Sequence, residues 1–173
     1  MPDPIIIRQE SPGDIPGIRR VNELAFGQTT EADLVDALRQ VCPELLSLVA
    51  EQDGQVIGHA LFSPVIIDGG GTTLKGMGLG PIAVLPQRQR QGIGAQLIQA
   101  GIRQLSGSGC PFINVLGHPE YYPRFGFVPA SRYGVRSEWE VPDEAFMLLV
   151  LDQSQPLAIP GVARYHPEFN RAV

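Results

Sequence analysis

Apolar residues in the first part of the chain follow two spacings, one typical of strands and one typical of helices. Ile5–Ile7 is a short β-branched run that predicts an opening strand. The segments beginning at Ser11 and Thr30 repeat their apolar residues at intervals of three and four, as amphipathic helices do. Phe26-Gly27 is typical of a helix end, and Thr30 is the expected cap of the second helix. We therefore expect the first strand to be followed by two helices.

The middle of the chain predicts paired strands and one β-α-β unit. Asp53-Gly54 is a hairpin signal, so the strands on either side of it should pair. Strands are expected over Leu46–Glu51, Gln55–Ile67, Leu74–Leu85, Phe112–Leu116 and Phe146–Leu151, and a further helix from about Gly92 to Leu105. The strands that flank this helix should be parallel, with a right-handed crossover, and the other pairs antiparallel. The pattern predicts a mixed α/β fold, and the tail after Pro156 is expected to pack on the surface.

Composition is typical of an ordinary globular protein. The chain has 173 residues, of which 43% are hydrophobic and 18% charged, so we expect one domain over residues 1–173 with a substantial core. Neither a signal peptide nor an apolar run long enough to span a membrane is evident, which favours the cytoplasm. Cys42 and Cys110 have neither disulfide nor zinc-site spacing. We therefore expect buried free thiols in a reducing compartment and no metal.

Charge is distributed unevenly along the sequence. The net charge is -5, yet no carboxylate occurs between Asp68 and Glu120. Nine of the 13 Lys and Arg residues and all 18 acidic residues lie outside this interval. The overall negative charge argues against a nucleic-acid partner, whereas the local positive charge indicates a small anionic ligand. The basic residues inside the interval are Lys75, Arg88, Arg90 and Arg103.

The segment from Gln89 to Ala95 leads into the third expected helix. A helix N-terminus presents backbone N–H groups without partners and about half a positive charge. Here the first turn has no carboxylate or hydroxyl to cap it, so its donors are available to an outside anion. Gly92 and Gly94 leave the backbone accessible, and Arg88 and Arg90 add positive charge. The alternative is that the glycines only permit a tight turn; the P-loop and Rossmann patterns are both absent.

Pro81 lies inside an apolar strand and marks an edge or a bulge. A bulge would splay this strand from its parallel neighbour at Phe112–Leu116. The backbone of Ile82, Ala83 and Val84 would then be free to pair with an extended, amide-containing ligand. A ligand with a pyrophosphate at one end and an amide-bearing arm is coenzyme A. The alternative is an edge-strand proline without functional meaning.

Two motifs resemble those of the GCN5-related N-acetyltransferase (GNAT) superfamily. Val84-x-Pro86-x-x-Gln89-x-x-Gly92-Ile-Gly94-Ala95 is similar to its acetyl-CoA-binding motif, Gln/Arg-x-x-Gly-x-Gly/Ala. Leu116-Gly-His-Pro-Glu-Tyr-Tyr-Pro-Arg-Phe-Gly-Phe127 resembles its second signature, Tyr-x-x-x-Gly-Phe after the fifth strand. The Gly-His-Pro, the double tyrosine and the ending Gly161–Phe169 resemble the YhbS-like branch of predicted acetyltransferases.

This resemblance extends over nearly the whole chain and implies the GNAT acyl-CoA N-acyltransferase fold. In that fold a mostly antiparallel central sheet has splayed, parallel fourth and fifth strands and is flanked by helices. The implied order is strand, two helices, three strands, helix, strand, helix, strand. Family members often form dimers, so a homodimer is a further expectation.

The resemblance also implies acetyl-CoA or coenzyme A as the cosubstrate. The backbone of Ile82 and Val84 would bind the pantetheine arm, with a backbone N–H near Val84 polarising the thioester carbonyl. Tyr122, four residues before Gly126, occupies the position of the general acid. A phenol with a pKa of about 10 stays protonated and can donate to a departing thiolate. The pyrophosphate would lie against Gln89, Arg90, Gln91, Gly92, Ile93, Gly94 and Ala95, with Arg88 or Arg90 near the phosphates.

Alternatives stay open for both tyrosines of the double tyrosine and for the base. Tyr122 can instead be a packing residue bonded to a backbone carbonyl, and Tyr121 is expected in the core. The strand over Leu74–Leu85 carries no acid, so a base must come from elsewhere. His59 could relay a proton through water. Glu23, His118, Glu120 and ordered water are the other candidates.

The expected activity is transfer of an acetyl group from acetyl-CoA to a primary amine of a small molecule or a protein, by direct attack in a ternary complex. A non-catalytic acyl-CoA sensor is the alternative that the missing strand carboxylate favours. Transfer of a longer acyl chain is a second alternative. Glu23, Glu31 and Asp33 form either an acidic rim suited to a cationic amine or a solvated helix face.

Overall fold

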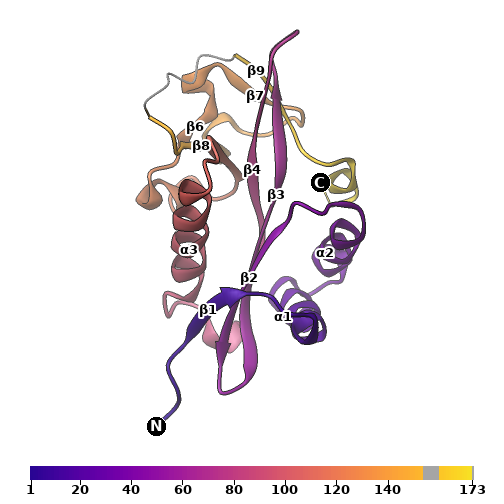
Figure 1. Ribbon diagram of the computed structural model, residues 1–173, viewed down its shortest axis with the longest axis vertical. Coiled ribbons are helices and arrows are strands. Elements are labelled where there is room, and N and C mark those ends of the chain that lie inside the picture. The colour runs from indigo at the N-terminus through magenta and orange to yellow at the C-terminus, as the bar shows by residue number, and fades with distance from the viewer. Residues whose placement is uncertain (154–159, 173) are drawn as a thin grey trace. The chain divides into compact units, whose positions relative to one another are not determined.

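The computed structural model describes residues 1–153 and 160–172, and its chain divides into two compact units (Figure 1). Unit 1 contains Met1–Phe62, Gly80–Gly101 and Pro167–Val173, and unit 2 contains Ser63–Leu79 and Ile102–His166. Two strands and one helix run from one unit into the other. The expectation of a single domain over residues 1–173 stays a prediction.

Most elements lie where the hydrophobic pattern predicts them. The α-helices are α1 (Ile15–Phe26), α2 (Thr30–Val41) and α3 (Ile93–Gly107). The strands are β1 (Ile6–Gln9), β2 (Leu46–Gln52), β3 (Gln55–Asp68), β4 (Thr73–Val84), β5 (Phe112–Leu116), β6 (Val128–Pro129), β7 (Val135–Ser137), β8 (Phe146–Val150) and β9 (Gly161–Arg164). The sequence pattern missed β6, β7 and β9, which have only two to four residues each.

One implied element is wrong: no α-helix lies between β5 and β8. Residues 117–145 instead form the 3-10 turns η3 (Tyr122–Phe125), η4 (Ala130–Tyr133) and η5 (Asp143–Ala145), with β6 and β7 between them. Prolines at positions 119, 123, 129 and 142 explain the difference. Each removes a backbone N–H donor and clashes with the preceding helical turn, so a continuous helix cannot form.

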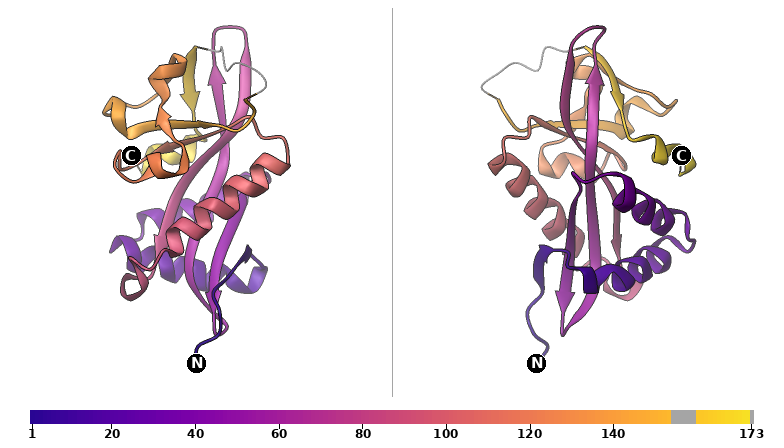
Figure 2. Two further views of the ribbon diagram at one scale, coloured as in Figure 1. Left: turned by 90° about the vertical axis from the view of Figure 1, so that its left-hand side faces the viewer. Right: turned by 45° about the vertical axis from the view of Figure 1, so that its right-hand side comes forward.

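The two N-terminal helices pack beside one another in unit 1 (Figure 2). Helix α1 ends as predicted at Gly27, whose φ of 69° is left-handed and whose N–H bonds to Glu23. Helix α2 begins with Thr29 in the cap position, one residue before the predicted Thr30. The backbone N–H of Asp33 donates to the Thr29 carbonyl at 2.8 Å, which closes the first turn at this residue. The apolar stripe of α2 is buried, and that of α1 is buried at Ile18 and Val21, whereas Leu24 is exposed.

In unit 1 the strands β1, β2 and β3 pair antiparallel in that order, as the hairpin signals predict. Asp53 (φ 53°) and Gly54 (φ 75°) are both left-handed, as the tight turn between β2 and β3 requires. The end of β4 joins this sheet, because the N–H of Leu85 donates to the Ile57 carbonyl at 3.0 Å.

Strand β3 contacts a different helix on each of its faces within unit 1. Neighbouring residues of a strand point to opposite faces. A Cβ at Gly58 would lie 3.1 Å from Ile93 and 3.2 Å from Leu97 of α3. The next residue, His59, bonds instead to Asn22 of α1. The sheet of unit 1 is therefore covered by α1 on one face and by the first turns of α3 on the other.

Close packing of α3 on β3 gives the first testable prediction. A Cβ at Gly101 would lie 2.2 Å from Cζ of Phe62, whose side chain is fully buried. Although alanine favours a helix over glycine by about 1 kcal/mol, we expect Gly101→Ala to lower the free energy of unfolding by about 1–3 kcal/mol because the core is overpacked. Denaturant titration measures the change.

The matched control for this prediction is Gly107→Ala on the same helix. No atom lies within 4 Å of a Cβ placed there. We expect this variant to be as stable as the parent or more stable by up to about 1 kcal/mol. Equal stability of the two alanine variants would contradict close packing at Gly101.

In unit 2 the two strands flanking α3 are parallel, as predicted. Met77, Gly78 and Leu79 of β4 pair with Ile113, Asn114 and Val115 of β5. This ladder ends directly before the cis bond between Gly80 and Pro81, where the sequence predicts a bulge. The neighbouring pairs β5–β8 and β6–β8 are antiparallel.

The C-terminal residues of the predicted surface tail join the fold. Strand β9 pairs antiparallel with β3 and parallel with β7, and Ala163 within it is fully buried. Residues 157–159 and 173 of the predicted tail lie outside the described residues. Cys42 and Cys110 are free, as predicted, but they are half-buried rather than buried. Among the described residues, no helix has the length and apolar character needed to cross a membrane.

Candidate functional site

The loop of residues 85–92 joins β4 to α3 within unit 1. It starts with the 3-10 turn η2 (Pro86–Arg88) and ends at Gly92, whose φ of 80° is left-handed. No atom lies within 4 Å of a Cβ placed on Gly92, so the space beside its backbone is open. Helix α3 starts at the next residue, Ile93, and its first turn carries no acidic residue. The positive end of the helix dipole is therefore accessible from the loop.

The two arginines of this loop differ from Arg8 of β1, Arg19 of α1 and Arg39 of α2. Arg8, Arg19 and Arg39 are each paired with at least two carboxylates. Within the described part of the chain, neither Arg88 nor Arg90 forms an ion pair. Both guanidinium groups can therefore neutralise an incoming phosphate without first leaving a carboxylate.

Two amide side chains hold the loop in shape. Nε2 of Gln89 donates to the Val84 carbonyl at 3.1 Å, and Nε of Arg88 donates to Oε1 of Gln91 at 3.2 Å. Gln89 is one of the residues predicted to hold the pyrophosphate, and its side chain is engaged in positioning the loop. The Val84 carbonyl, one of the predicted pantetheine-binding groups, already accepts one hydrogen bond and has a second lone pair.

Tyr122 lies in unit 2, at the start of η3. The ring lies over Gly117, where a Cβ would be only 2.4 Å from Cε2 of the tyrosine. Edge-to-face contacts to Tyr121 (5.1 Å between centroids) and Phe127 (5.8 Å) hold the ring from the sides. The turn ends at Gly126, whose φ is 100°. The Tyr-x-x-x-Gly spacing therefore encodes one short turn that fixes the tyrosine.

The hydroxyl of Tyr122 is available for chemistry. The side chain is half-buried, and within the described residues no hydrogen bond engages its oxygen. Burial, followed by the neighbouring Tyr121, raises the pKa of the Tyr122 phenol to about 12. The phenol is therefore protonated at neutral pH and can donate its proton. The alternative prediction requires a backbone carbonyl that accepts a hydrogen bond from this hydroxyl, and the described residues show none.

Tyr121 takes a different position from the core location predicted for it. It is half-buried, and the guanidinium of Arg124 lies 4.4 Å from its ring centroid. Nε of Arg124 also donates to the Tyr121 carbonyl at 3.0 Å. Tyr121 therefore forms the outer wall of the aromatic cluster that surrounds Tyr122.

Comparison with known proteins identifies the family. The acetyltransferase (GNAT) domain family matches residues 6–130, a span that contains the loop of residues 85–92 and the tyrosine turn. The uncharacterized N-acetyltransferase YhbS of Escherichia coli K12 is 38% identical over 168 residues, which is 96% of this chain and 99% of that protein. The chain belongs to the GNAT acetyltransferase family.

Two solved GNAT structures resemble this chain over nearly their whole length. The crystal structure of Escherichia coli YhbS in complex with CoA has a TM-score of 0.88 and 37% identity, covering 97% of this chain and 94% of that one. A GNAT acetyltransferase from Brucella melitensis in complex with acetyl-CoA has a TM-score of 0.78 and 41% identity, covering 96% and 98%. The fold implied by the sequence resemblance is therefore confirmed.

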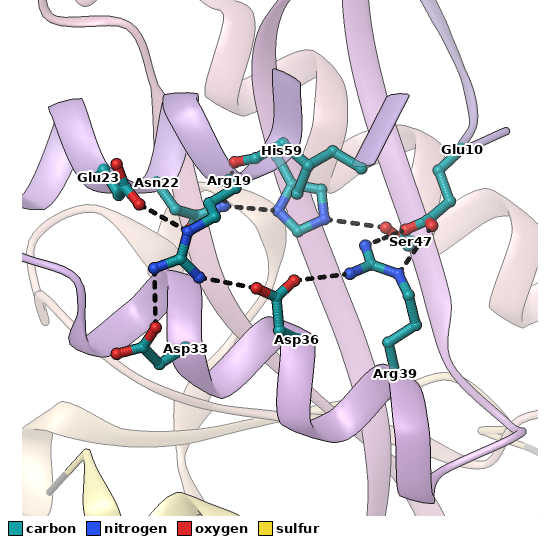
Figure 3. Close-up of polar contacts among 10 residues, drawn as sticks. Glu10, Arg19, Asn22, Glu23, Asp33, Asp36, Arg39, Ser47 and His59 are labelled. Carbon is teal, nitrogen blue, oxygen red and sulfur yellow. Dashed lines mark hydrogen bonds and ion pairs between the residues drawn. The ribbon is translucent and has the colours of Figure 1, made fainter. Parts of the chain in front are cut away.

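His59, a predicted base in this GNAT chain, is fully buried within unit 1 (Figure 3). Its Nδ1 lies 3.2 Å from Nδ2 of Asn22, and its Nε2 lies 2.9 Å from Oγ of Ser47. Nδ2 of Asn22 also donates to the Ile18 carbonyl at 3.0 Å. Because a carbonyl needs a donor, the amide nitrogen of Asn22 must be the atom that faces both groups. Nδ1 of His59 is then an acceptor, and the ring proton lies on Nε2 and points to Ser47.

This arrangement argues against His59 as the base. A second ring proton, on Nδ1, would point at the N–H of Asn22. Burial lowers the pKa of His59 to about 4; the charge of Arg39 lowers it further and the charge of Glu10 opposes both effects. The imidazole is therefore neutral at physiological pH and resists taking a proton. Its partners, Asn22 and Ser47, were not singled out from the sequence, although Asn22 interrupts the apolar stripe of α1 and was a usable signal.

The lowered pKa of His59 predicts a loss of stability in acid. An unfolded histidine has a pKa of 6.5, so as the pH falls the unfolded chain takes the proton before the folded chain does. The destabilisation caused by this proton uptake is absent above about pH 7.5. The free energy of unfolding should fall by about 3 kcal/mol as the pH drops from about 7 to about 4. Denaturant titrations across this range measure it.

NMR of the histidine rings assigns this effect to His59. We expect its ring signals to stay in the neutral form down to about pH 5. His118→Gln is the control, because that side chain is exposed and its loss should leave the acid sensitivity unchanged. A His59 ring that titrates near pH 6.5 would contradict the burial argument.

Glu23, the second predicted base, is part of an ion-pair network between α1 and α2. Arg19 contacts Glu23 at 2.7 Å, Asp33 at 2.9 Å and Asp36 at 2.7 Å (Figure 3). Arg39 links the same Asp36, at 3.1 Å, to Glu10 on the far side. Two members of the predicted acidic rim, Glu23 and Asp33, therefore share one arginine, whereas the third, Glu31, accepts hydrogen bonds from Gln28. Glu23 would have to leave Arg19 to act as a base.

The remaining predicted bases lie just before Tyr122 in unit 2. The side chains of His118 and Glu120 are both exposed. The His118 carbonyl accepts the backbone N–H of Tyr121 at 3.1 Å, which fixes the start of the turn. Throughout the described residues, no group of three or more His, Cys, Asp or Glu side chains could hold a metal ion.

Proposed function

We propose that this chain transfers the acetyl group of acetyl-CoA to a primary amine of a small molecule or a protein, by direct attack in a ternary complex. The accessible N-terminus of α3, with two arginines that lack carboxylate partners, carries the proposal. The relatives from Escherichia coli and Brucella melitensis that were crystallised with CoA and acetyl-CoA support it.

The cofactor site that we propose follows the loop of residues 85–92 into α3. Backbone N–H groups from Gln91 to Ala95 bind the pyrophosphate, and Arg88 and Arg90 add positive charge. Gly92 and Gly94 leave room for phosphate oxygens. The pantetheine arm pairs with the backbone of β4 at Ile82, Ala83 and Val84, directly after Pro81 has ended the ladder with β5.

The proposed chemistry needs one acid and no strongly basic side chain. The amine nitrogen attacks the thioester carbonyl, which a backbone N–H near Val84 polarises. As the C–S bond breaks, its electron pair stays on sulfur, and Tyr122 supplies the proton. The attacking amine gives up its own proton to ordered water, since His59 is neutral and buried and Glu23 is paired with Arg19.

A second candidate, an acyl-CoA sensor without turnover, is favoured by one observation. Strand β4 carries no carboxylate, and the two predicted bases on β3 and α1 are both engaged by protein partners. The free hydroxyl of Tyr122 favours the enzyme. Transfer of a longer acyl chain, the cytoplasmic location and the homodimer stay predictions from the sequence.

Calorimetric titration with acetyl-CoA and with CoA, followed by a free-thiol assay over a panel of primary amines, tests the proposal. Binding of both ligands together with amine-dependent thiol release supports the enzyme. Binding without thiol release on any amine of the panel favours the sensor. Absence of binding would overturn both candidates, because both rest on the cofactor site.

A further inference from the structure

Arg124 lies in unit 2, two residues after Tyr122 on the turn η3, and contacts with one neighbour hold its guanidinium in place. The guanidinium carbon lies 4.4 Å from the ring centroid of Tyr121. Nε of the same group donates to the Tyr121 carbonyl at 3.0 Å. Because Tyr121 supplies both the stacking surface and the hydrogen-bond acceptor, the turn itself positions the guanidinium.

The two terminal nitrogens of this guanidinium have no carboxylate partner. Within the part of the chain that the structure describes, Arg124 forms no ion pair. Glu120 is the nearest acidic residue in the sequence, and its exposed side chain pairs with none of the described basic residues. The terminal N–H groups of a guanidinium match the two oxygens of a carboxylate or a phosphate. Arg124 therefore presents an anion-binding fork whose position is already fixed, which lowers the entropy cost of binding.

The fork lies next to the aromatic cluster that holds Tyr122. The Tyr121 ring under the guanidinium meets the Tyr122 ring edge to face, with 5.1 Å between the two centroids. The guanidinium and the phenol are thus separated by one aromatic ring. An anion bound to Arg124 would therefore lie close to the phenol that gives its proton to the departing sulfur in the proposed reaction.

Two substrates could bring an anion to this place: coenzyme A through its phosphates, or the amine through a charged group of its own. Under the proposed function, the pyrophosphate binds at the N-terminus of α3, where Arg88 and Arg90 add positive charge. The pantetheine arm separates this pyrophosphate from the sulfur that Tyr122 protonates. The 3′-phosphate is further from the sulfur still along the cofactor. These separations favour the acceptor amine as the source of an anion beside Tyr122.

We propose that Arg124 is a specificity-determining residue: its guanidinium fork binds a carboxylate or phosphate group that the amine acceptor carries. The inference rests on the proposed function, which gives Tyr122 its place at the reaction centre. The acceptor is then an amine with a negative group a few bonds from its nitrogen, as in an amino acid, rather than a polycation. The ion pairs of unit 1 agree with this class, because Glu23 and Asp33 of the predicted acidic rim already share Arg19.

Probes that resemble the product test the inference without turnover. N-acetylglycine carries a carboxylate, whereas N-acetylglycinamide has nearly the same size and no charge. Each is titrated into protein saturated with CoA, and backbone NMR shifts report binding. We expect the parent to bind the charged probe about three- to tenfold more tightly, and Arg124→Gln to bind the two probes equally. Absence of a preference in the parent, or a preference that survives Arg124→Gln, would overturn the inference.

Two matched variants separate the fork from overall charge. Arg136→Gln on β7 removes the charge of another exposed arginine of unit 2 and should leave the preference unchanged. Arg124→Lys keeps the charge but lacks the planar fork, so it should lose most of the preference. If Arg136→Gln and Arg124→Gln reduced the preference equally, only net charge would act, and the proposed fork would be wrong.

Calorimetry with CoA and with dephospho-CoA, which lacks the 3′-phosphate, identifies the source of the anion. We expect Arg124→Gln to bind both cofactors as tightly as the parent does. Weaker binding of CoA alone would give the fork to the 3′-phosphate, and weaker binding of both would give it to the pyrophosphate; either result overturns the assignment to the acceptor. Absence of CoA binding to the parent would instead overturn the proposed function, so the two failures are distinguishable.

In turnover Arg124 should act on KM. For amines that carry a carboxylate, we expect Arg124→Gln to raise KM about three- to tenfold with kcat nearly unchanged, because the fork contacts the acceptor and not the reacting atoms. The corresponding neutral amides should show no change in KM. A loss confined to kcat would mean that Arg124 acts through Tyr122 rather than by binding the acceptor, and would overturn the inference.

Discussion

Replacing Tyr122 with phenylalanine is expected to lower kcat for thiol release from acetyl-CoA by about 100- to 10,000-fold, the usual contribution of a general acid. The variant removes one oxygen and keeps the ring that packs over Gly117 and against Phe127. Affinity for acetyl-CoA should therefore change little, and the loss should appear in kcat rather than KM. Stopped assays of free thiol, with calorimetry of acetyl-CoA binding on the same samples, separate the two quantities.

The adjacent tyrosine is the matched control. Tyr121→Phe makes the same chemical change one residue earlier, on a ring that contacts Tyr122 edge to face. It should retain activity within about threefold, because its effect on Tyr122 is indirect. Since the pKa of Tyr122 is raised to about 12, deprotonation of its phenol should lower kcat only above about pH 11. Equal activity of the parent and Tyr122→Phe would remove the tyrosine from the mechanism.

Local sequence signals predicted the parts of the site that are made by consecutive residues. The loop of residues 85–92 depends on the left-handed Gly92 and on an acid-free first helical turn, and both are visible in the sequence. The Tyr122 turn depends on a glycine four residues later, which is equally local. The parallel ladder of β4 and β5 followed from one helix connecting two strands.

Contacts between distant residues account for what the sequence did not predict. His59 was an open candidate base until Asn22 and Ser47, 37 and 12 residues away, fixed its tautomer. Glu23 is an open candidate in the sequence, because only the fold pairs it with Arg19 alongside two aspartates of α2. Neither charge state nor burial can be read from a residue alone, because both depend on which partners the fold supplies.

The short strands of unit 2 were missed for a related reason. β6 and β7 have two and three residues, too few to show an alternating pattern. β7 depends on pairing with β9, since Val135–Ser137 pairs with Gly161–Ala163 some 26 residues later, and β9 also pairs with β3. The helix implied after β5 failed on a local signal that was present, because four prolines lie between positions 117 and 145.

Placing a negative charge at Gly92 is expected to weaken acetyl-CoA binding by at least about 100-fold, or about 3 kcal/mol. Gly92→Asp tests this prediction best. Aspartate tolerates the φ of 80° better than most residues, so the strain stays small. Its carboxylate would occupy the open space beside the backbone and lie next to the N-terminus of α3, where the proposed site receives the pyrophosphate. Calorimetric titration with acetyl-CoA measures the loss.

Gly92→Asn separates charge from shape, because asparagine has nearly the same size and the same tolerance of left-handed backbone. If the loop binds an anion, the asparagine variant should lose at most about tenfold in affinity, and the gap between the two variants should shrink as salt is added. The aspartate also caps the helix dipole, so this variant should be at least as stable to unfolding as the asparagine variant. Weaker binding together with an equal or greater stability would show that the positive end of α3 is reserved for the ligand. Equal affinities of the aspartate and asparagine variants would mean that no anion binds beside Gly92.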